Sequence, residues 1–250
     1  MNRRRFLKGS ILSAATLPLA GCADRLSRTD WAVNLLGYAE RLSEVVQRAI
    51  AGDALAREYT EADISPVFRP NGSTDPSDPD YRALAANGFR DYRLRVGGAV
   101  EHPMTLSLED IRGLPDRTQI TRHDCVEGWS VIGKWRGARL GALLDRIGPR
   151  PNARYVVFHC ADRLYGEDNY YESIAIADAY HPQTLLAYEL NDESLPIANG
   201  APVRLRCERQ LGYKMAKYIM RIELVESLEG IQGGRGGFWE DRGYQWYAGI

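Results

Sequence analysis

Short segments rich in β-branched residues alternate irregularly with short helical segments through most of the chain. Residues 91–100 alternate polar and apolar side chains and end near Gly97-Gly98, which is typical of a strand entering a turn. Further strands are predicted at 153–160 and 201–208, and short helices at 106–115, 138–148 and 173–181. Because there is no internal repeat and no change of composition, the sequence predicts one mixed α+β domain from about residue 53 onward.

The charge balance and the hydropathy of the chain exclude two classes of protein. The 250 residues include 32 basic and 33 acidic side chains, a formal net charge of −1, so no nucleic-acid partner is expected. No apolar run reaches the ~18 residues that a membrane-spanning helix needs. The longest run, residues 11–20, is interrupted by Ser13, Thr16 and Pro18. We therefore expect a globular domain without a membrane span.

Residues 1–22 resemble an export signal and do not enter the fold prediction. Three arginines at positions 3–5 precede Phe-Leu-Lys, as in twin-arginine signals, which carry proteins that are already folded. The sequence Leu-Ala-Gly-Cys at 19–22 resembles a bacterial lipobox, whose cysteine is lipid-modified after cleavage. We therefore expect twin-arginine export and a lipid anchor on Cys22, on the periplasmic side of the cell envelope. The alternative is a cytosolic chain with a basic N-terminus.

We expect the core of the domain between residues 66 and 230, with one further segment before it, one at its start and one after it. Residues 23–65 carry apolar side chains near helical spacing, which predicts an N-terminal helical segment. Residues 66–79 are dense in Pro, Asn, Asp, Ser and Gly, which predicts a loop, and ordered loops of this length are often functional. Residues 231–250 carry two Trp, two Tyr and one Phe among glycines, so we expect an aromatic extension packed on the domain.

The cysteines indicate what chemistry the domain can carry. With Cys22 assigned to the lipid, Cys125, Cys160 and Cys207 remain. An odd number in an oxidising compartment leaves at least one cysteine for a ligand or a reactive role. Cys125 is the candidate, because it lies in Arg-His-Asp-Cys-Val-Glu-Gly-Trp-Ser, between a predicted strand and a glycine.

Three interpretations of Cys125 are open at this point. It is a small buried apolar residue, a nucleophile whose pKa is lowered by His123, or the ligand of a soft metal. Zinc is not favoured, because none of the 4 histidines has paired ligand spacing with a cysteine or another histidine. A metal held by one thiolate would take its other ligands from an organic cofactor, which requires an anion-binding shell elsewhere in the chain.

Residues 199–217 offer such a shell. Asn199 and Arg204 stand at the start of a predicted strand, and Lys214 and Lys217 follow in Gly-Tyr-Lys-Met-Ala-Lys. A guanidinium fork and an ammonium group that converge on one phosphate provide strong anion recognition. The alternative is ordinary surface charge.

Three stretches, in this order, resemble the sulfite oxidase family of molybdopterin enzymes, and are closest to its methionine-sulfoxide reductase branch. They are residues 122–140, 181–205 and 211–226. In that family the cysteine of Cys-Val-Glu-x-Trp-Ser is the single protein ligand of molybdenum, which implies this role for Cys125. The Asn and Arg of Asn-Gly-x-Pro-x-Arg bind the pterin and its phosphate, which implies these contacts for Asn199 and Arg204.

The resemblance implies further cofactor contacts. They fall on Phe68, Arg69 and Asn71 in the predicted loop, on Cys160, and on Met215, Ala216 and Lys217. The reductase branch has a threonine in place of Cys160, so a cofactor contact or a disulfide with Cys207 remain alternatives. The fold implied is the α+β molybdopterin-binding domain of sulfite oxidases, without their C-terminal immunoglobulin-like dimerisation domain or haem domain, and we expect a monomer.

The function implied by the resemblance is oxygen-atom or electron transfer at a molybdenum–molybdopterin cofactor, on a sulfoxide or another small oxide. Cys125 and Glu127 are the expected catalytic residues, and electrons would come from a membrane protein, which contains haem in the reductase branch. The alternative is an envelope cysteine acyl-transferase that uses Cys125 and His123. A third interpretation is a binding lipoprotein that kept the fold and lost the chemistry. Tyr171 and Tyr213 either line the pocket or pack in the core.

Overall fold

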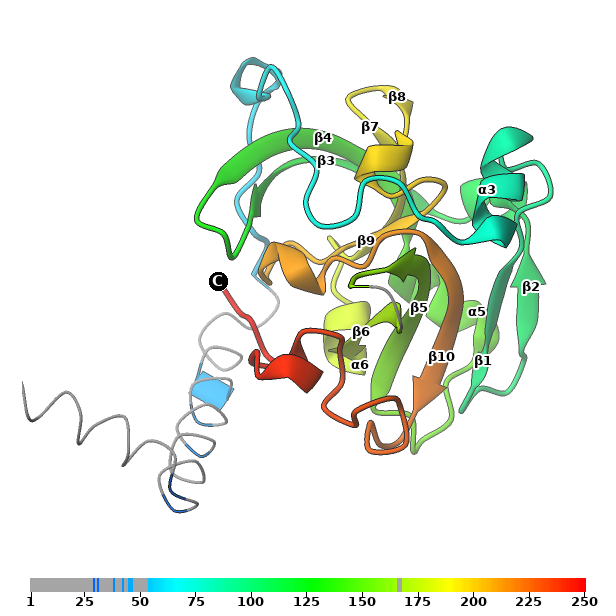
Figure 1. The fold of residues 1–250 in the computed structure, drawn as a ribbon, viewed down its shortest axis with the longest axis vertical. Coiled ribbons are helices and arrows are strands. Elements are labelled where there is room, and N and C mark those ends of the chain that lie inside the picture. The colour runs from blue at the N-terminus through cyan, green and yellow to red at the C-terminus, as the bar shows by residue number, and fades with distance from the viewer. Residues whose placement is uncertain are drawn as a thin grey trace, which may run out of the picture. The chain divides into compact units, whose positions relative to one another are not determined.

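The computed structural model describes residues 54–165 and 168–250, with a few isolated positions before them (Figure 1). The chain divides into two compact units, Met1–Gly52 and Asp53–Ile250, and the second unit carries everything discussed below. The predicted export signal and Cys22 lie outside the described residues. In the predicted N-terminal helical segment, helical positions are described at Trp31, Tyr38, Leu42, Val45 and Val46.

Five strands form the first sheet, in the order β2-β1-β10-β5-β6. They are β1 (Leu94–Gly98), β2 (Met104–Leu106), β5 (Tyr155–Arg163), β6 (Asn169–Ala175) and β10 (Ile219–Val225). β1 runs parallel to β10, and all other neighbours are antiparallel. β5 lies between β10 and β6, and its Val156, Val157 and Phe158 are fully buried, so both faces of this strand are covered. The main hydrophobic core of the domain packs on this sheet.

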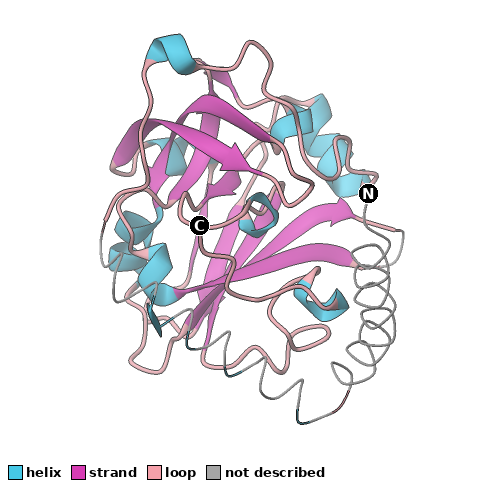
Figure 2. Ribbon diagram, turned by 90° about the vertical axis from the view of Figure 1, so that its left-hand side faces the viewer, coloured by secondary structure: helices cyan, strands magenta, loops and turns pink. Residues whose placement is uncertain are grey.

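The second sheet has the order β3-β4-β7-β8, and β9 pairs with β7. Its strands are β3 (Asp116–Asp124), β4 (Ser130–Arg139), β7 (Leu185–Leu190), β8 (Glu193–Ser194) and β9 (Arg204–Arg206). Figures 1 and 2 both place this sheet above the first one. Gly137 allows β4 to approach β7, because a Cβ there would lie 2.4 Å from the carbonyl oxygen of Leu186. β3 and β4 form a long hairpin whose free end, at Asp124 and Ser130, borders the site described below.

The helices are short and mostly connect strands. They are α3 (Pro79–Ala86), α4 (Leu108–Arg112), α5 (Leu140–Ile147) and α6 (Ile176–Ala179), with 3₁₀ turns η1 (Glu61–Asp63), η2 (Ile197–Asn199), η3 (Gly212–Lys214) and η4 (Glu240–Arg242). α4 begins at a capping box of Ser107 and Asp110, in which each side chain accepts from or donates to the backbone or side chain of the other. α5 buries apolar residues spaced for one helix face and ends at Gly148, which has a left-handed backbone.

The predicted α+β single domain is confirmed, and most predicted elements are present. The strands predicted at 91–100, 153–160 and 201–208 correspond to β1, β5 and β9. The helix predicted at 173–181 is wrong in its first three residues, which belong to β6, because Ser173 and Ile174 pair with β5. The predicted loop has no helix or strand until α3 begins at Pro79.

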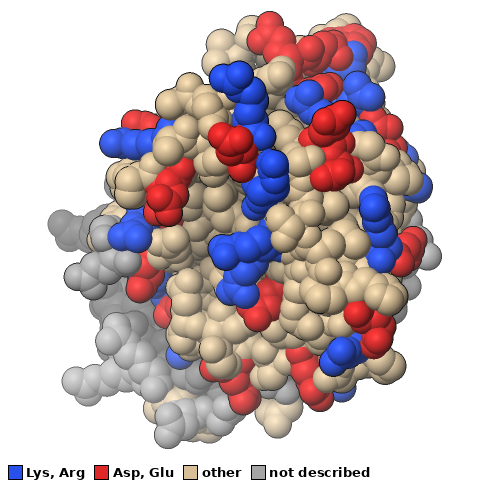
Figure 3. Space-filling view, turned by 90° about the vertical axis from the view of Figure 1, so that its right-hand side faces the viewer, with Lys and Arg blue, Asp and Glu red and all other residues tan. Residues whose placement is uncertain are grey.

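The outer surface carries charges of both signs. On the face over the right-hand side of Figure 1, a band of Lys and Arg side chains is bordered on both sides by acidic side chains (Figure 3). Within the described part of the chain, no helix has the length and apolar character required to cross a bilayer.

Candidate active site

The β3–β4 hairpin positions Cys125 as the first residue beyond β3. The Cys125 N–H donates to the carbonyl of Trp129 at 2.9 Å, and the Gly128 N–H donates to the carbonyl of Cys125 at 3.0 Å. Gly128 has φ +85°, a left-handed conformation that glycine adopts without strain. The resulting tight turn leaves Cys125 half-buried at the end of the hairpin.

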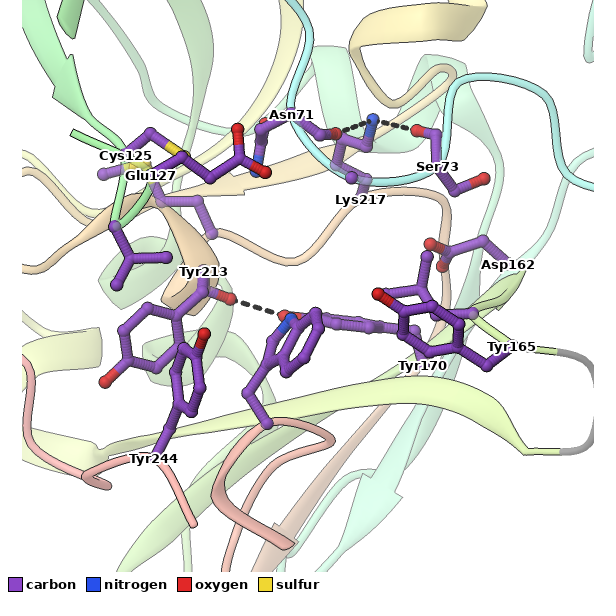
Figure 4. A pocket seen from close by; sticks show the side chains of 15 residues that line it. Asn71, Ser73, Cys125, Glu127, Asp162, Tyr165, Tyr170, Tyr213, Lys217 and Tyr244 are labelled. Carbon is purple, nitrogen blue, oxygen red and sulfur yellow. Dashed lines mark hydrogen bonds between the residues drawn. The ribbon is translucent and has the colours of Figure 1, made fainter. Parts of the chain in front are cut away.

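Cys125 opens into a cavity of about 350 Å³ (Figure 4). The residues that line it come from the predicted loop, the turn of the hairpin, β5 and β6 with their connection, η3 with the segment after it, and the C-terminal extension. They are Asn71, Gly72, Ser73, Cys125, Val126, Glu127, Asp162, Leu164, Tyr165, Tyr170, Tyr213, Met215, Lys217, Trp239 and Tyr244. The structure thus brings five predicted site residues to one cavity: Asn71, Cys125, Glu127, Met215 and Lys217.

Lys217 joins the predicted loop to the wall of this cavity. Its Nζ donates to the carbonyl oxygens of Asn71, at 2.7 Å, and of Ala198, at 2.8 Å, and also to that of Ser73. Burial, reinforced by the nearby Arg204 charge, lowers the pKa of Lys217 to about 7. These three hydrogen bonds fix the predicted loop at the cavity. They show how a segment more than a hundred residues away from Lys217 in sequence comes to line the same cavity.

Arg204 and Asn199 lie next to Lys217, and some of their donors have no partner. Gly200 permits this arrangement, because a Cβ there would lie 3.0 Å from the Lys217 side chain and 3.1 Å from Arg204. Arg204 is fully buried and donates to the Asn199 carbonyl at 2.9 Å, yet its Nε and the Asn199 Nδ2 are buried without a hydrogen-bond partner. Burial, with the Arg206 charge beside it, lowers the pKa of Arg204 to about 9.

Among the described residues, Arg204 has no carboxylate partner. Burying a guanidinium without a counter-ion costs free energy of folding, unless an anion or another acceptor bonds its remaining donors. The free donors of Arg204 and Asn199 therefore fit the phosphate and the polar edge of a bound cofactor. The described residues contain no group of three His, Cys, Asp or Glu side chains arranged for a metal, so a metal at Cys125 would take most of its ligands from such a cofactor.

Other predicted contacts lie outside the cavity lining. Phe68 is buried edge-on against Trp135, with ring centroids 5.0 Å apart, and the guanidinium of the exposed Arg69 lies 4.8 Å from the Trp129 ring centroid. Ala216 is buried, and its carbonyl accepts from the Leu205 N–H at 2.8 Å. None of these three residues lines the cavity.

Cys160 lies in the main hydrophobic core, as does Cys207. Both are free thiols, so the alternative of a disulfide between them is not present in this structure. Burial raises the pKa of both thiols, which makes them poor nucleophiles.

Lys214 does not take part in the anion-binding shell, contrary to the sequence prediction. Its ammonium group is fully buried and forms ion pairs with Glu172 of β6, at 2.5 Å, and with Glu240 of the C-terminal extension. The two carboxylates satisfy this charge, so Lys214 holds the extension on the domain rather than binding a ligand. Tyr171 likewise packs in the core and donates to Asp241 at 2.6 Å, whereas Tyr213 lines the cavity.

His123 is not paired with Cys125. It is fully buried beneath the hairpin, with Nδ1 3.1 Å from Arg206 Nη1 and 3.3 Å from the sulfur of Met215. Burial and the Arg206 charge lower the pKa of His123 well below its ordinary value, so His123 is neutral. Burial also raises the pKa of the Cys125 thiol, the opposite of what a nucleophilic cysteine needs. This geometry gives no support to a Cys–His dyad.

Asp162 is a site residue that sequence reasoning missed. It stands near the end of β5, lines the cavity, is 3% exposed, and its Oδ1 has no hydrogen-bond partner. Burial raises the pKa of Asp162 to about 7, although the Lys217 charge opposes this. Nothing in the sequence around Asp162 distinguishes it from a surface aspartate, because the charge that faces it, Lys217, is distant in sequence.

We expect Asp162→Asn to change how stability depends on pH. The folded pKa of about 7 exceeds the unfolded value of about 3.9, so the native state binds more protons between these values and wild-type stability falls as pH rises through this window. The Asp162→Asn variant should not show this decrease in stability with rising pH, because its side chain does not titrate. At about pH 8 it should be more stable than the wild type by roughly 2–4 kcal/mol, measured by chemical denaturation of the cofactor-free protein.

The matched control is Asp75→Asn, which removes a carboxylate that is 73% exposed. It should leave the pH dependence of unfolding almost unchanged. If Asp162→Asn and the wild type lost stability in parallel between about pH 5 and pH 8, the buried-carboxylate interpretation would be wrong.

The fold and this cavity define a molybdopterin-dependent oxidoreductase. The chain belongs to the family described as "Oxidoreductase molybdopterin binding domain", whose sequence profile matches residues 83–230. The family resemblance, the fold class and the cofactor predicted from the sequence are thereby confirmed.

Relatives of known name agree with this assignment. The chain is 36% identical over 248 residues to YedZ1 of Azospira oryzae, which is named as a protein-methionine-sulfoxide reductase subunit, and the match covers 99% of this chain and 87% of YedZ1. It is 38% identical over 165 residues to MsrP of Xanthomonas axonopodis, a protein-methionine-sulfoxide reductase catalytic subunit. That match covers 62% of this chain and 51% of MsrP, so the chain spans about half the length of that relative.

A solved structure shares the fold. The sulfane dehydrogenase SoxCD of Paracoccus pantotrophus aligns with a TM-score of 0.50 at 22% identity, covering 60% of this chain and 45% of that one. At this level of sequence identity, the match is evidence for a shared fold and not for a shared substrate.

Proposed function

We propose that this protein reduces sulfoxides, with methionine sulfoxide in proteins as the substrate, at a molybdenum–molybdopterin cofactor ligated by Cys125. The observation that carries the proposal is that Cys125 and Lys217 share one cavity, next to unpartnered donors of Arg204 and Asn199. The names of YedZ1 and MsrP support the substrate class, since both describe parts of protein-methionine-sulfoxide reductases.

The residues of the chain divide the work between holding the cofactor and handling protons. When bound, the cofactor supplies two-electron oxygen-atom transfer, in which a sulfoxide, two electrons and two protons give a sulfide and water. Cys125 supplies the thiolate ligand, and since burial raises its pKa, it needs the metal to remain deprotonated near neutral pH. Arg204 and Asn199 hold the cofactor's anionic part with their free donors, and Lys217, whose three donors all bond backbone carbonyls, holds the loop beside it. Asp162 holds a proton at the cavity near neutral pH.

The proposal extends to location and partner. The protein is exported by the twin-arginine route, is anchored by a lipid on Cys22, and takes electrons from a haem-containing membrane protein on the periplasmic side. The motifs in residues 1–22 support the export route and the anchor, and the haem-containing partner is carried over from the reductase branch that the sequence resembles. Cys22→Ala should release the protein from the membrane fraction, and replacing the paired arginines by lysines should keep it in the cytoplasm. A Cys22→Ala protein that stays with the membrane would contradict the lipid anchor.

The test of the function uses protein expressed with intact cofactor synthesis. We expect about one molybdenum per chain, a paramagnetic signal of pentavalent molybdenum, and reduction of methionine sulfoxide by a reduced viologen dye. Protein without molybdenum that shows thiol-dependent acyl transfer would support the acyl-transferase instead. Protein with molybdenum that reduces no sulfoxide would preserve the class and overturn the substrate.

A further inference from the structure

We propose that Tyr165, Trp239 and Tyr244, here called the aromatic rim, select the substrate at this cavity. The rim binds the peptide on either side of a methionine sulfoxide, so that protein-bound sulfoxide reacts in preference to small free sulfoxides. This inference rests on the proposed function and adds to it the residues that determine specificity.

The rim is one continuous set of ring contacts. Trp239 stacks on Tyr244, with ring centroids 5.1 Å apart and planes at 29°, and Tyr165 meets Trp239 edge-on at 6.2 Å. Tyr213 extends the set, because its ring meets Tyr244 edge-on at 5.3 Å. All four side chains line the cavity, so an incoming ligand meets an aromatic surface supplied by three separate parts of the chain.

Two members of the rim have more exposed side chains than is usual for large aromatic residues. Tyr165 is 82% exposed and Tyr244 is 39% exposed, although both have large rings that folding normally buries. Tyr165 also has φ +61°, a left-handed conformation that is costly for a bulky residue. Strain of this kind is concentrated at functional sites, where it holds a side chain in a set position.

The rim lies across the cavity from the predicted cofactor-binding residues. Figure 4 shows Cys125, Asn71 and Lys217 along one side and Tyr213 and Tyr244 on the opposite side. A ligand in the cavity therefore lies between the Cys125 side and these tyrosines. The rim itself carries no charge, which favours a neutral ligand over an ionic one such as sulfite.

The C-terminal extension that supplies Trp239 and Tyr244 is firmly held. Glu240, next to Trp239 in sequence, forms the buried ion pair with Lys214. Phe238 is fully buried and stacks on Tyr170 with centroids 5.5 Å apart, and Trp246 Nε1 donates to Ser173 Oγ at 2.8 Å. This part of the rim is therefore formed before a ligand arrives, so little conformational entropy is lost on binding.

The chemistry of the rim fits a peptide segment. Flat aromatic faces pack well against alkyl side chains and peptide planes, and sulfur makes favourable contacts with aromatic rings. A cavity of about 350 Å³ admits a side chain and a little backbone, but not a folded surface. The occupant is therefore an extended or locally unfolded segment that carries the sulfoxide.

The test compares Tyr165→Ala and Tyr244→Ala with the wild-type enzyme, loaded with cofactor and reduced by a viologen dye. kcat/KM is measured for an unfolded protein that contains methionine sulfoxide and for dimethyl sulfoxide, which is too small to contact the rim and the reacting centre together. The kcat/KM for the protein substrate is divided by the kcat/KM for dimethyl sulfoxide. We expect this ratio to fall about tenfold in each variant, mainly because the KM for the protein substrate rises.

The matched control is Tyr180→Ala, since Tyr180 is 43% exposed and does not line this cavity. Its ratio should equal that of the wild type. If the rim variants lowered kcat/KM for both sulfoxides equally, or for neither, the rim would not select the substrate and the inference would be overturned while the proposed function stood. A wild-type enzyme that reduces neither sulfoxide would overturn the proposed function and this inference with it.

Discussion

Cys125→Ser is expected to abolish the activity without unfolding the protein. Cys125 is half-buried at the end of a hairpin, and serine has nearly the same shape, so the fold should be retained. A serine hydroxyl does not replace a thiolate as the ligand of a soft metal. Since even the loss of groups that merely orient a ligand costs 10- to 100-fold in metal affinity or activity, removal of the ligand itself should lower turnover by at least about a thousandfold.

Three measurements check this expectation: molybdenum content, the pentavalent molybdenum signal, and sulfoxide turnover with a reduced dye. Cys207→Ala is the control, because it removes a buried thiol that does not line the cavity. Alkylation at about pH 9 adds an independent readout, since Cys125 should react in the cofactor-free protein and be protected in the loaded one. A Cys125→Ser protein that retains molybdenum and turns over would refute the assigned ligand.

Arg206→Met is expected to destabilise the fold, whereas Arg204→Met is expected to leave stability almost unchanged and to impair cofactor retention. Both arginines are fully buried and lie over the Trp135 ring, at 5.0 and 4.5 Å from its centroid. Only Arg206 has a carboxylate partner, and it donates to Glu208 through two nitrogen atoms. The two sites therefore match in burial and packing and differ in whether the charge is neutralised by the protein.

Removing Arg206 leaves the buried carboxylate of Glu208 without its partner, so Arg206→Met should lower the free energy of unfolding by about 3–5 kcal/mol. Arg204→Met removes a buried charge that the protein does not neutralise, so the free energy of unfolding of the cofactor-free protein should change by no more than about 1 kcal/mol. The same variant should retain less than about a tenth of the wild-type molybdenum.

Denaturant unfolding of the cofactor-free variants, with metal analysis of the proteins as purified, decides between these outcomes. Equal destabilisation by the two substitutions would mean that Arg204 serves the fold. Full molybdenum retention in Arg204→Met would mean that the donors of Arg204 do not hold the cofactor.

The sequence located the part of the site that is carried by local motifs. The predicted residues Asn71, Cys125, Glu127, Met215 and Lys217 share one cavity, and each belongs to a short motif that the family resemblance identifies. Lys214 and Lys217 show where this approach ends. They belong to the same short motif, but Lys214 is neutralised by Glu172 and Glu240, which are 42 and 26 residues away in sequence. No local sequence pattern predicts these ion pairs.

The aromatic side of the cavity was not predictable for the same reason. Trp239 and Tyr244 were expected only to pack on the domain, and Tyr165 was not singled out at all. Their shared role depends on the β5–β6 connection meeting the C-terminal extension, a contact between distant segments. The sequence predicts strands best where β-branched residues are continuous, as in β5, whereas it gives no signal for most of β6 and predicts a helix at its end.

The pairing of β1 with β10 has a consequence for the order of events in the cell. Leu94–Gly98 finds its parallel neighbour only at Ile219–Val225, which also lies against β5. A nascent chain still attached to the ribosome lacks this middle strand until almost all of it has been made. Shortened products that end before β10 should therefore be targets for proteolysis, and cofactor insertion should follow the completion of translation.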